Sequence, residues 1–90
     1  MVTVKKFSAT WCGPCRALAP VMTQIKESYN GNSNIKFEEI DIDEYSEAVQ
    51  KYNVTSVPTV IIEKDGEVIE RFTGLSSKIA YVNAINESLN

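Results

Sequence analysis

The chain has two cysteines, Cys12 and Cys15, which are separated by Gly13 and Pro14. Two thiols at this spacing can close a small disulfide ring where the backbone turns into a helix. A thiol at a helix N-terminus gains from unpaired N–H groups and the positive end of the helix dipole, which lower its pKa from about 8.5. We therefore predict a reversible redox couple in which an exposed Cys12 attacks first. Cys15 lies one turn further into the helix and is shielded by the protein, so we predict that it resolves the mixed disulfide formed by Cys12.

The two residues between the cysteines suit this chemistry. Pro14 fits the first turn of a helix, where its missing N–H costs nothing, and Gly13 leaves room for a substrate backbone. A purely structural disulfide is a weaker explanation, because so short a loop stabilises little. Half of a zinc site is also weaker, since such sites usually need four Cys or His ligands and this chain has two Cys and no His.

Composition narrows the class of protein. Ninety residues with 43% hydrophobic content predict one domain, residues 1–90, that folds around a single core without a bound cofactor. The net charge of −3 and the interspersed charges exclude the basic surface of a nucleic-acid binder. No apolar segment has the length of a signal peptide or membrane span, so we expect no membrane association and a cytoplasmic location. In that reducing compartment a cysteine pair is more readily catalytic than structural.

The apolar pattern predicts an α/β fold. Strands are expected over 2–7, 35–42, the later part of 54–62, and 68–72; helices are expected over 12–29, 44–52 and around 81–89. Pro20 should kink the first helix, Asn53 should end the second in a left-handed conformation, and a serine should cap the third. A crossover makes the first two strands parallel, and the turn at 64–67 makes the last two a hairpin.

The run Trp11-Cys12-Gly13-Pro14-Cys15 resembles the active-site signature of the thioredoxin family. The similarity extends along the chain to a set of spaced positions: Phe7, Ala9, Pro20, Asp43, Pro58, Thr59, Gly66 and Gly74. It implies a thioredoxin-like, four-stranded mixed sheet of order 2-1-3-4, with the first and last helices on one face and the middle helix on the other. It also implies a cis Val57–Pro58 bond opposite the cysteines.

The strand and helix that usually come first in the family are missing from this pattern. The chain therefore resembles a minimal thioredoxin-like protein of glutaredoxin size, with one sheet edge and part of one face less covered. A glutaredoxin-like, glutathione-dependent reductase is the less favoured label, because that motif usually carries Pro-Tyr between its cysteines.

The resemblance implies a thiol–disulfide oxidoreductase that reduces protein disulfides through a Cys12–Cys15 couple. A flat apolar rim would hold an extended substrate peptide: Trp11, Gly13, Pro14, Val57, Pro58 and Gly74. A thioredoxin reductase drawing on NADPH would reset the pair, with a glutathione-linked system or another dithiol as alternatives, and the protein is expected to be a monomer. Other classes remain open: a redox-independent binding module or enzyme subunit, and a disulfide-forming oxidase or isomerase, which would need an oxidising compartment.

Two charges fall in line with apolar residues. Lys6 falls on the same strand face as Val2 and Val4, and Glu39 falls on the same face as Ile35 and Phe37. The resembling family usually has a buried acid at the first position and often a lysine at the second, so the signs are exchanged. A buried ion needs a partner, since removing one member of a buried pair costs about 3–5 kcal/mol, so we predict that Lys6 and Glu39 form a buried pair. The alternative is that Lys6 reaches an exposed sheet edge. Either Glu39, through a water, or the charge of Lys6 could then assist deprotonation of Cys15.

Overall fold

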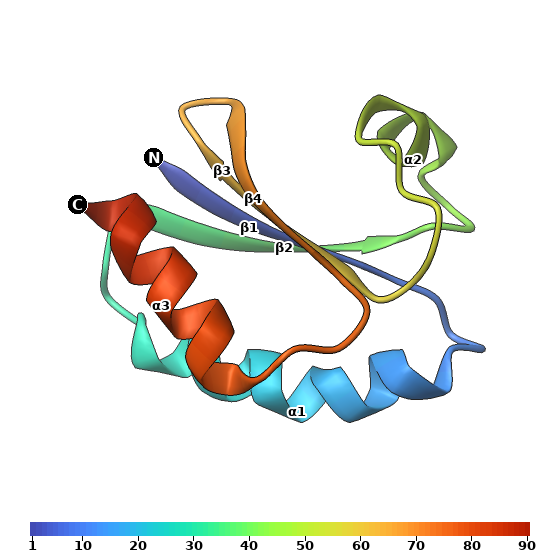
Figure 1. Ribbon diagram of the computed structural model, residues 1–90, viewed down its shortest axis with the longest axis horizontal. Coiled ribbons are helices and arrows are strands. Elements are labelled where there is room, and N and C mark those ends of the chain that lie inside the picture. Colours follow the sequence, from blue (N-terminus) through green and yellow to red (C-terminus); the bar gives the residue numbers. More distant parts are fainter.

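The computed structural model describes all 90 residues, and its elements follow the predicted order (Figure 1). They are β1 (Val2–Ser8), α1 (Gly13–Ser28), β2 (Ile35–Asp41), α2 (Ser46–Lys51), β3 (Thr59–Lys64), β4 (Glu67–Thr73) and α3 (Lys78–Leu89).

The four strands form one mixed sheet of order β2-β1-β3-β4, which confirms the topology that the resemblance implied. β1 runs parallel to β2 and antiparallel to β3, and β3 and β4 form the hairpin. The turn between them needs two residues with positive φ, and Asp65 and Gly66 supply them at 53° and 84°. Asp-Gly is a preferred sequence for this kind of tight turn, so the hairpin follows from local chemistry.

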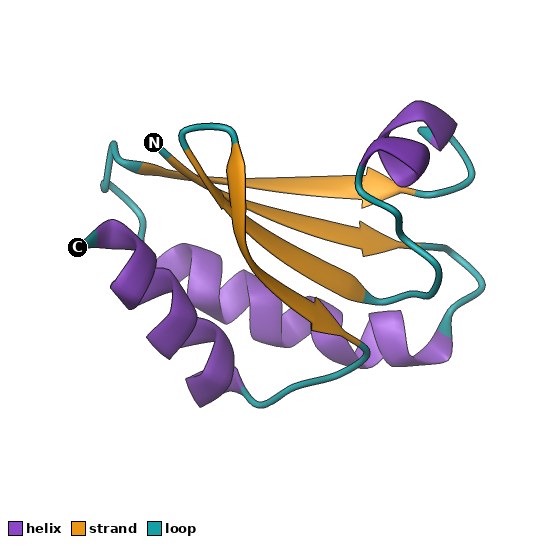
Figure 2. Ribbon diagram, turned by 45° about the horizontal axis from the view of Figure 1, so that its top comes forward, coloured by secondary structure: helices purple, strands orange, loops and turns teal.

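Helices cover both faces of the sheet. Figure 2 shows α1 and α3 together beneath it and α2 on the opposite side, above the end where β1 and β2 finish. Because strand side chains alternate between faces, Val2 and Val4 of β1 pack toward α1 and α3, whereas Phe7 packs toward α2. The main core fills the α1 and α3 side; its members are Val2, Val4, Leu18, Met22, Ile25, Ile35, Val60, Ile62, Tyr81 and Ile85.

The observed helix α1 begins and ends within one residue of the predicted range 12–29. Cys12 is its N-cap, Pro14 lies in the first turn, and Pro20 lies inside the helix. Helix α3 is capped by Ser77, whose hydroxyl accepts the Ala80 N–H at 3.1 Å, as the sequence predicted.

Helix α2 is shorter than predicted. Asn53 does adopt the expected left-handed conformation, with φ of 52°. Tyr45, which falls within the predicted range 44–52, instead precedes the helix with φ −121° and ψ 62°, and its side chain is 55% exposed. Its non-helical backbone takes the side chain off the face that Tyr52 occupies, and Tyr52 alone of the two reaches Phe7.

Charged side chains line the α2 side of the sheet. The Lys5 ammonium lies 2.6 Å from Glu38 Oε1 and 3.3 Å from Glu63 Oε1, and the Tyr52 hydroxyl donates to Glu63 Oε2 at 2.7 Å. Burial opposes the charge of Lys5, but its bonds to the two carboxylates outweigh this and raise its pKa. The same contact with Lys5 lowers the pKa of Glu38. The sequence pattern did not reveal this network.

Candidate active site

Cys12 and Cys15 are joined in a disulfide at the start of α1, with their Cα atoms 5.3 Å apart. Cys12 has an extended backbone and serves as the N-cap. The backbone N–H of Cys15 donates to Cys12 Sγ at 3.2 Å, so the cap interaction is made by the sulfur itself. An N–H donor and the positive end of a helix both favour a negative charge on this sulfur. The helix start therefore favours Cys12 as a thiolate once the disulfide is reduced.

The predicted difference in exposure between the cysteines is wrong for this disulfide-bonded state. Cys12 is 5% exposed and Cys15 is 4% exposed. Ala9 and the loop before β3 account for the burial of Cys12, since Val57 packs on the cysteine pair and its carbonyl oxygen lies 3.7 Å from Cys12 Sγ. The two sulfurs differ instead in their surroundings: Cys12 receives the helix N–H, and Cys15 borders a polar pocket on the sheet side of α1.

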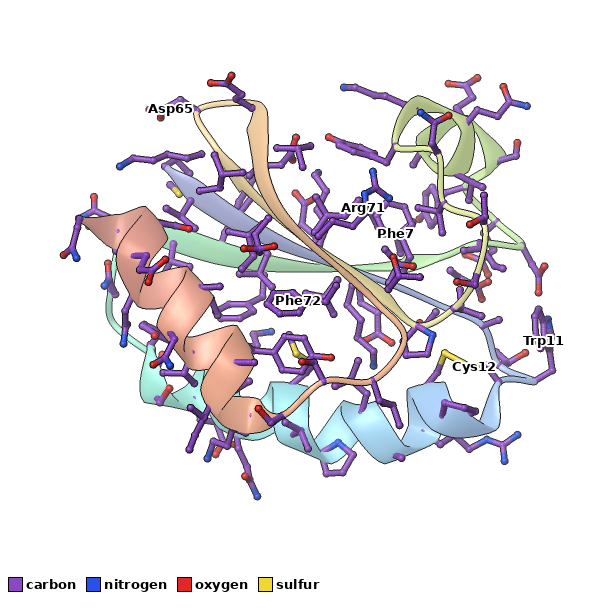
Figure 3. The ribbon with its side chains drawn as sticks, in the orientation of Figure 1. Phe7, Trp11, Cys12, Asp65, Arg71 and Phe72 are labelled. Atoms are coloured by element: carbon purple, nitrogen blue, oxygen red, sulfur yellow. A yellow bond between two sulfur atoms is a disulfide. The ribbon has the colours of Figure 1, made fainter.

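The predicted rim residues gather around the disulfide, with one exception. Trp11 is 63% exposed beside Cys12 (Figure 3), Gly13 and Pro14 are exposed, and Val57 and Gly74 are half-buried. Pro58 is fully buried, so its side chain is not part of the surface. The Val57–Pro58 bond is cis, as the resemblance implied.

Pro58 instead connects the two loops of the rim. Its carbonyl oxygen accepts the Gly74 N–H at 2.8 Å, and Gly74 has φ of 82°, a conformation that favours glycine. The side chain is buried because Pro58 leads directly into β3, whose first five residues are all buried.

Trp11 is held by Asp43, a residue for which the sequence predicted no role. Its indole N–H donates to Asp43 Oδ2 at 2.9 Å. Because β1 and β2 are parallel, with Ser8 opposite Asp41, the loops that follow them leave the sheet at the same edge. The parallel order of these two strands could have predicted the contact. It places Asp43, which follows β2, next to Trp11, which follows β1.

Comparisons with known proteins agree with this geometry. The model of the Thioredoxin family matches residues 1–87. The chain belongs to the thioredoxin family. It is 39% identical over 88 residues to thioredoxin of Bacillus subtilis (strain 168), an alignment that covers 98% of this chain and 83% of that protein.

Solved thioredoxins share the fold. A mutant thioredoxin from Halobacterium salinarum NRC-1 superposes with a TM-score of 0.87 at 32% identity, covering 99% of this chain and 75% of that one. The oxidized form of mitochondrial thioredoxin 3 from Saccharomyces cerevisiae superposes with a TM-score of 0.83 at 31% identity, covering 96% of this chain and 77% of that one. With its cysteine pair in disulfide contact, this member of the family is a protein-disulfide oxidoreductase whose redox centre is part of the chain.

Lys6 and Glu39, at the positions where the thioredoxin resemblance led us to expect exchanged charges, do approach each other. Lys6 Nζ lies 3.7 Å from Glu39 Oε1, but the Lys6 side chain is 7% exposed and that of Glu39 is 70% exposed. The predicted burial of the pair is therefore wrong for Glu39. β2 is an edge strand, so the Glu39 carboxylate can extend to solvent. The alternative, in which Lys6 itself reaches solvent at the edge, does not agree with its burial.

None of the helices combines the length and apolar character needed to cross a bilayer. No cluster of three or more His, Cys, Asp or Glu side chains is arranged to hold a metal ion.

Proposed function

We propose that Cys12 is the attacking thiol and Cys15 the resolving thiol in the reduction of protein disulfides. The observation that carries this assignment is the hydrogen bond from the Cys15 N–H to Cys12 Sγ at the helix N-cap. The Cys12 thiolate attacks one sulfur of the substrate disulfide, and the other sulfur leaves as a thiolate that takes a proton from solvent. Cys15 then attacks Cys12 Sγ, which releases the second substrate thiol and forms the Cys12–Cys15 disulfide. Two electrons pass to the substrate.

The substrate would lie extended across the exposed rim around Trp11. Neither the N–H nor the C=O of Val57 is paired with another backbone group. An extended peptide could pair with both, in the manner of a strand added to a sheet edge. In this arrangement Trp11, Gly13 and Pro14 contact side chains of the substrate, and Gly74 limits the opposite side. Pro58 acts from below by fixing the two loops.

The proposed electron donor is a thioredoxin reductase that uses NADPH, and the proposed location is the cytoplasm. Family membership and the 39% identity to a bacterial thioredoxin support both assignments. We also propose that the protein acts as a monomer of one domain, residues 1–90, since the cysteine pair and the residues around it lie close together within one chain. NADPH oxidation in the presence of purified thioredoxin reductase and a protein disulfide tests the donor. Turnover with glutathione and glutathione reductase alone would contradict it.

Brief alkylation of the reduced protein near neutral pH is expected to modify Cys12 about tenfold or more faster than Cys15. One pKa unit of difference between the thiols would produce this factor. Peptide mapping after a short iodoacetamide pulse measures both sites in one sample. Faster labelling of Cys15 would reverse the assigned roles.

Asp43→Ala is expected to lower kcat/KM for a protein disulfide about fivefold, because the Trp11 ring loses the hydrogen bond that orients it, worth about 1 kcal/mol. Steady-state reduction of insulin-type disulfides measures the effect. Asp65→Asn is the matched control, since it removes the charge of an exposed acid at the hairpin turn and asparagine tolerates the positive φ of that position. Equal activity of the two variants would show that the Trp11–Asp43 contact has no part in substrate binding.

A further inference from the structure

Lys6 is a buried cation that the mechanism so far does not use. It lies on the face of β1 that packs against α1, and its side chain is 7% exposed. Its single ion-pair partner is Glu39, whose carboxylate is 3.7 Å away and largely solvated. A lysine in such a place keeps much of its electrostatic effect on neighbouring groups, because burial leaves few solvent dipoles to screen it.

Lys6 and Cys15 line the same open pocket, which has a volume of about 420 Å³. The pocket lies between α1 and the ends of β1 and β2. Small and polar residues, among them Ser8 and Ala19, complete its wall. The residue that carries the ammonium and the residue that carries the resolving sulfur therefore border one shared open space.

The other charged or titratable groups facing this pocket come from three segments: Arg16 of α1, Glu39 and Asp41 of β2, and Glu44 and Tyr45 of the loop after β2. Arg16 is exposed and donates to the Thr10 carbonyl oxygen, and Asp41 accepts the Asp43 N–H. On the far side of Lys6 a smaller pocket is lined by Glu38 and Lys26. Lys6 is the one buried cation among these groups.

Glu39 fits poorly as a base for Cys15. Its side chain is 70% exposed, and the Ser8 hydroxyl donates to its Oε1 at 3.4 Å. A carboxylate in that position is solvated and paired, and it would oppose a second negative charge in the pocket rather than favour one.

We propose that Lys6 is a positioning residue for the second step: its ammonium group stabilises the Cys15 thiolate and so speeds attack on the mixed disulfide. A nearby lysine lowers the pKa of a cysteine because it favours the charged form. The Cys15 proton passes to solvent, which the open pocket admits, and the thiolate then forms the Cys12–Cys15 bond as the bond to the substrate breaks. This inference rests on the proposed role of Cys15 as the resolving thiol.

The test measures the pKa of Cys15 in full-length Cys12→Ser protein, from the pH dependence of its alkylation rate. Adding Lys6→Met is expected to raise that pKa by about one unit, a tenfold loss of thiolate at neutral pH. Lys6→Arg is expected to leave the Cys15 pKa close to that of the Cys12→Ser protein, because arginine retains the positive charge. Lys26→Met is the matched control and should leave the pKa of Cys15 unchanged, since Lys26 lines the neighbouring pocket and not that of Cys15.

In the two-cysteine protein, Lys6→Met should shift the pH profile of mixed-disulfide resolution to higher pH, measured in a single turnover. An unchanged Cys15 pKa in folded Lys6→Met protein would overturn the proposal. If that variant does not fold, Lys6→Gln decides, because it removes the charge of Lys6 and keeps a polar side chain: a higher Cys15 pKa supports the proposal and an unchanged one contradicts it. Failure of the Cys12 and Cys15 assignment would show separately, as faster alkylation of Cys15 in the unmutated protein.

Discussion

Cys12→Ser is expected to lower the rate of protein-disulfide reduction by about a thousandfold or more, which corresponds to about 4 kcal/mol of barrier. The serine hydroxyl cannot supply the thiolate that accepts the Cys15 N–H and opens the substrate disulfide. Reduction of insulin-type disulfides measures the loss.

Cys15→Ser is expected to be equally inactive in turnover but for a different reason. Cys12 still attacks, and the reaction stops at a mixed disulfide with the substrate because no second thiolate displaces it. The trapped complex would be visible as a covalent adduct on a non-reducing gel and would disappear with dithiothreitol. An adduct formed by Cys12→Ser in place of Cys15→Ser would contradict the assigned order.

The same variants test the alternative of a redox-independent binding module. Serine nearly matches cysteine in size, so the doubly substituted protein should retain the fold, which circular dichroism can verify. If that protein kept full biological activity, the physiological role would be binding rather than disulfide reduction. We expect it to lose activity, because disulfide reduction needs both thiols.

Lys5→Met is expected to lower the free energy of unfolding by about 3 kcal/mol, since removing one member of a buried charge pair leaves the other without compensation. The group left behind is Glu63, whose side chain is 9% exposed and whose remaining partner is the Tyr52 hydroxyl. Urea denaturation followed by circular dichroism measures the change.

Lys36→Met is the matched control for Lys5→Met. Lys36 also pairs with Glu38, at 3.2 Å, but its side chain is 56% exposed. Exposed pairs contribute about 0–1 kcal/mol, so this variant should be close to the unmodified protein. The double change Lys5→Met and Glu63→Gln should recover most of the stability, because it removes both buried charges together and keeps an acceptor for the Tyr52 hydroxyl. Equal losses in Lys5→Met and Lys36→Met would show that burial of Lys5 has no special effect.

The pH dependence of stability gives a second measure of this network. Lys5 holds the pKa of Glu38 below its usual value, so Glu38 is more acidic in the folded chain than in the unfolded one. Its contribution is therefore present at neutral pH and is lost as the pH falls through the lowered folded pKa. The difference in stability between the unmodified protein and Lys5→Met should narrow in acid. A difference that stays constant between neutral pH and the acid limit of folding would contradict this account.

The sequence by itself determined the features that depend on neighbouring residues. The spacing of Leu18, Met22 and Ile25 predicted α1, a serine in the loop before α3 predicted its N-cap, and Asp65-Gly66 predicted the hairpin turn. Each is a preference expressed within one or two turns of chain. The cysteine pair belongs to the same group, because two intervening residues and a helix start suffice to define its chemistry.

Only the tertiary structure decided which groups are buried and what they meet. Cys12 is covered by the loop before β3, and Pro58 lies beneath the rim rather than on it. Lys6 and Glu39 have similar positions in their strands, yet β1 is central and β2 is at the edge, so one charge is buried and the other is solvated. Burial and charge pairing depend on segments far apart in the chain, and alternation along a single strand does not tell an edge strand from a central one.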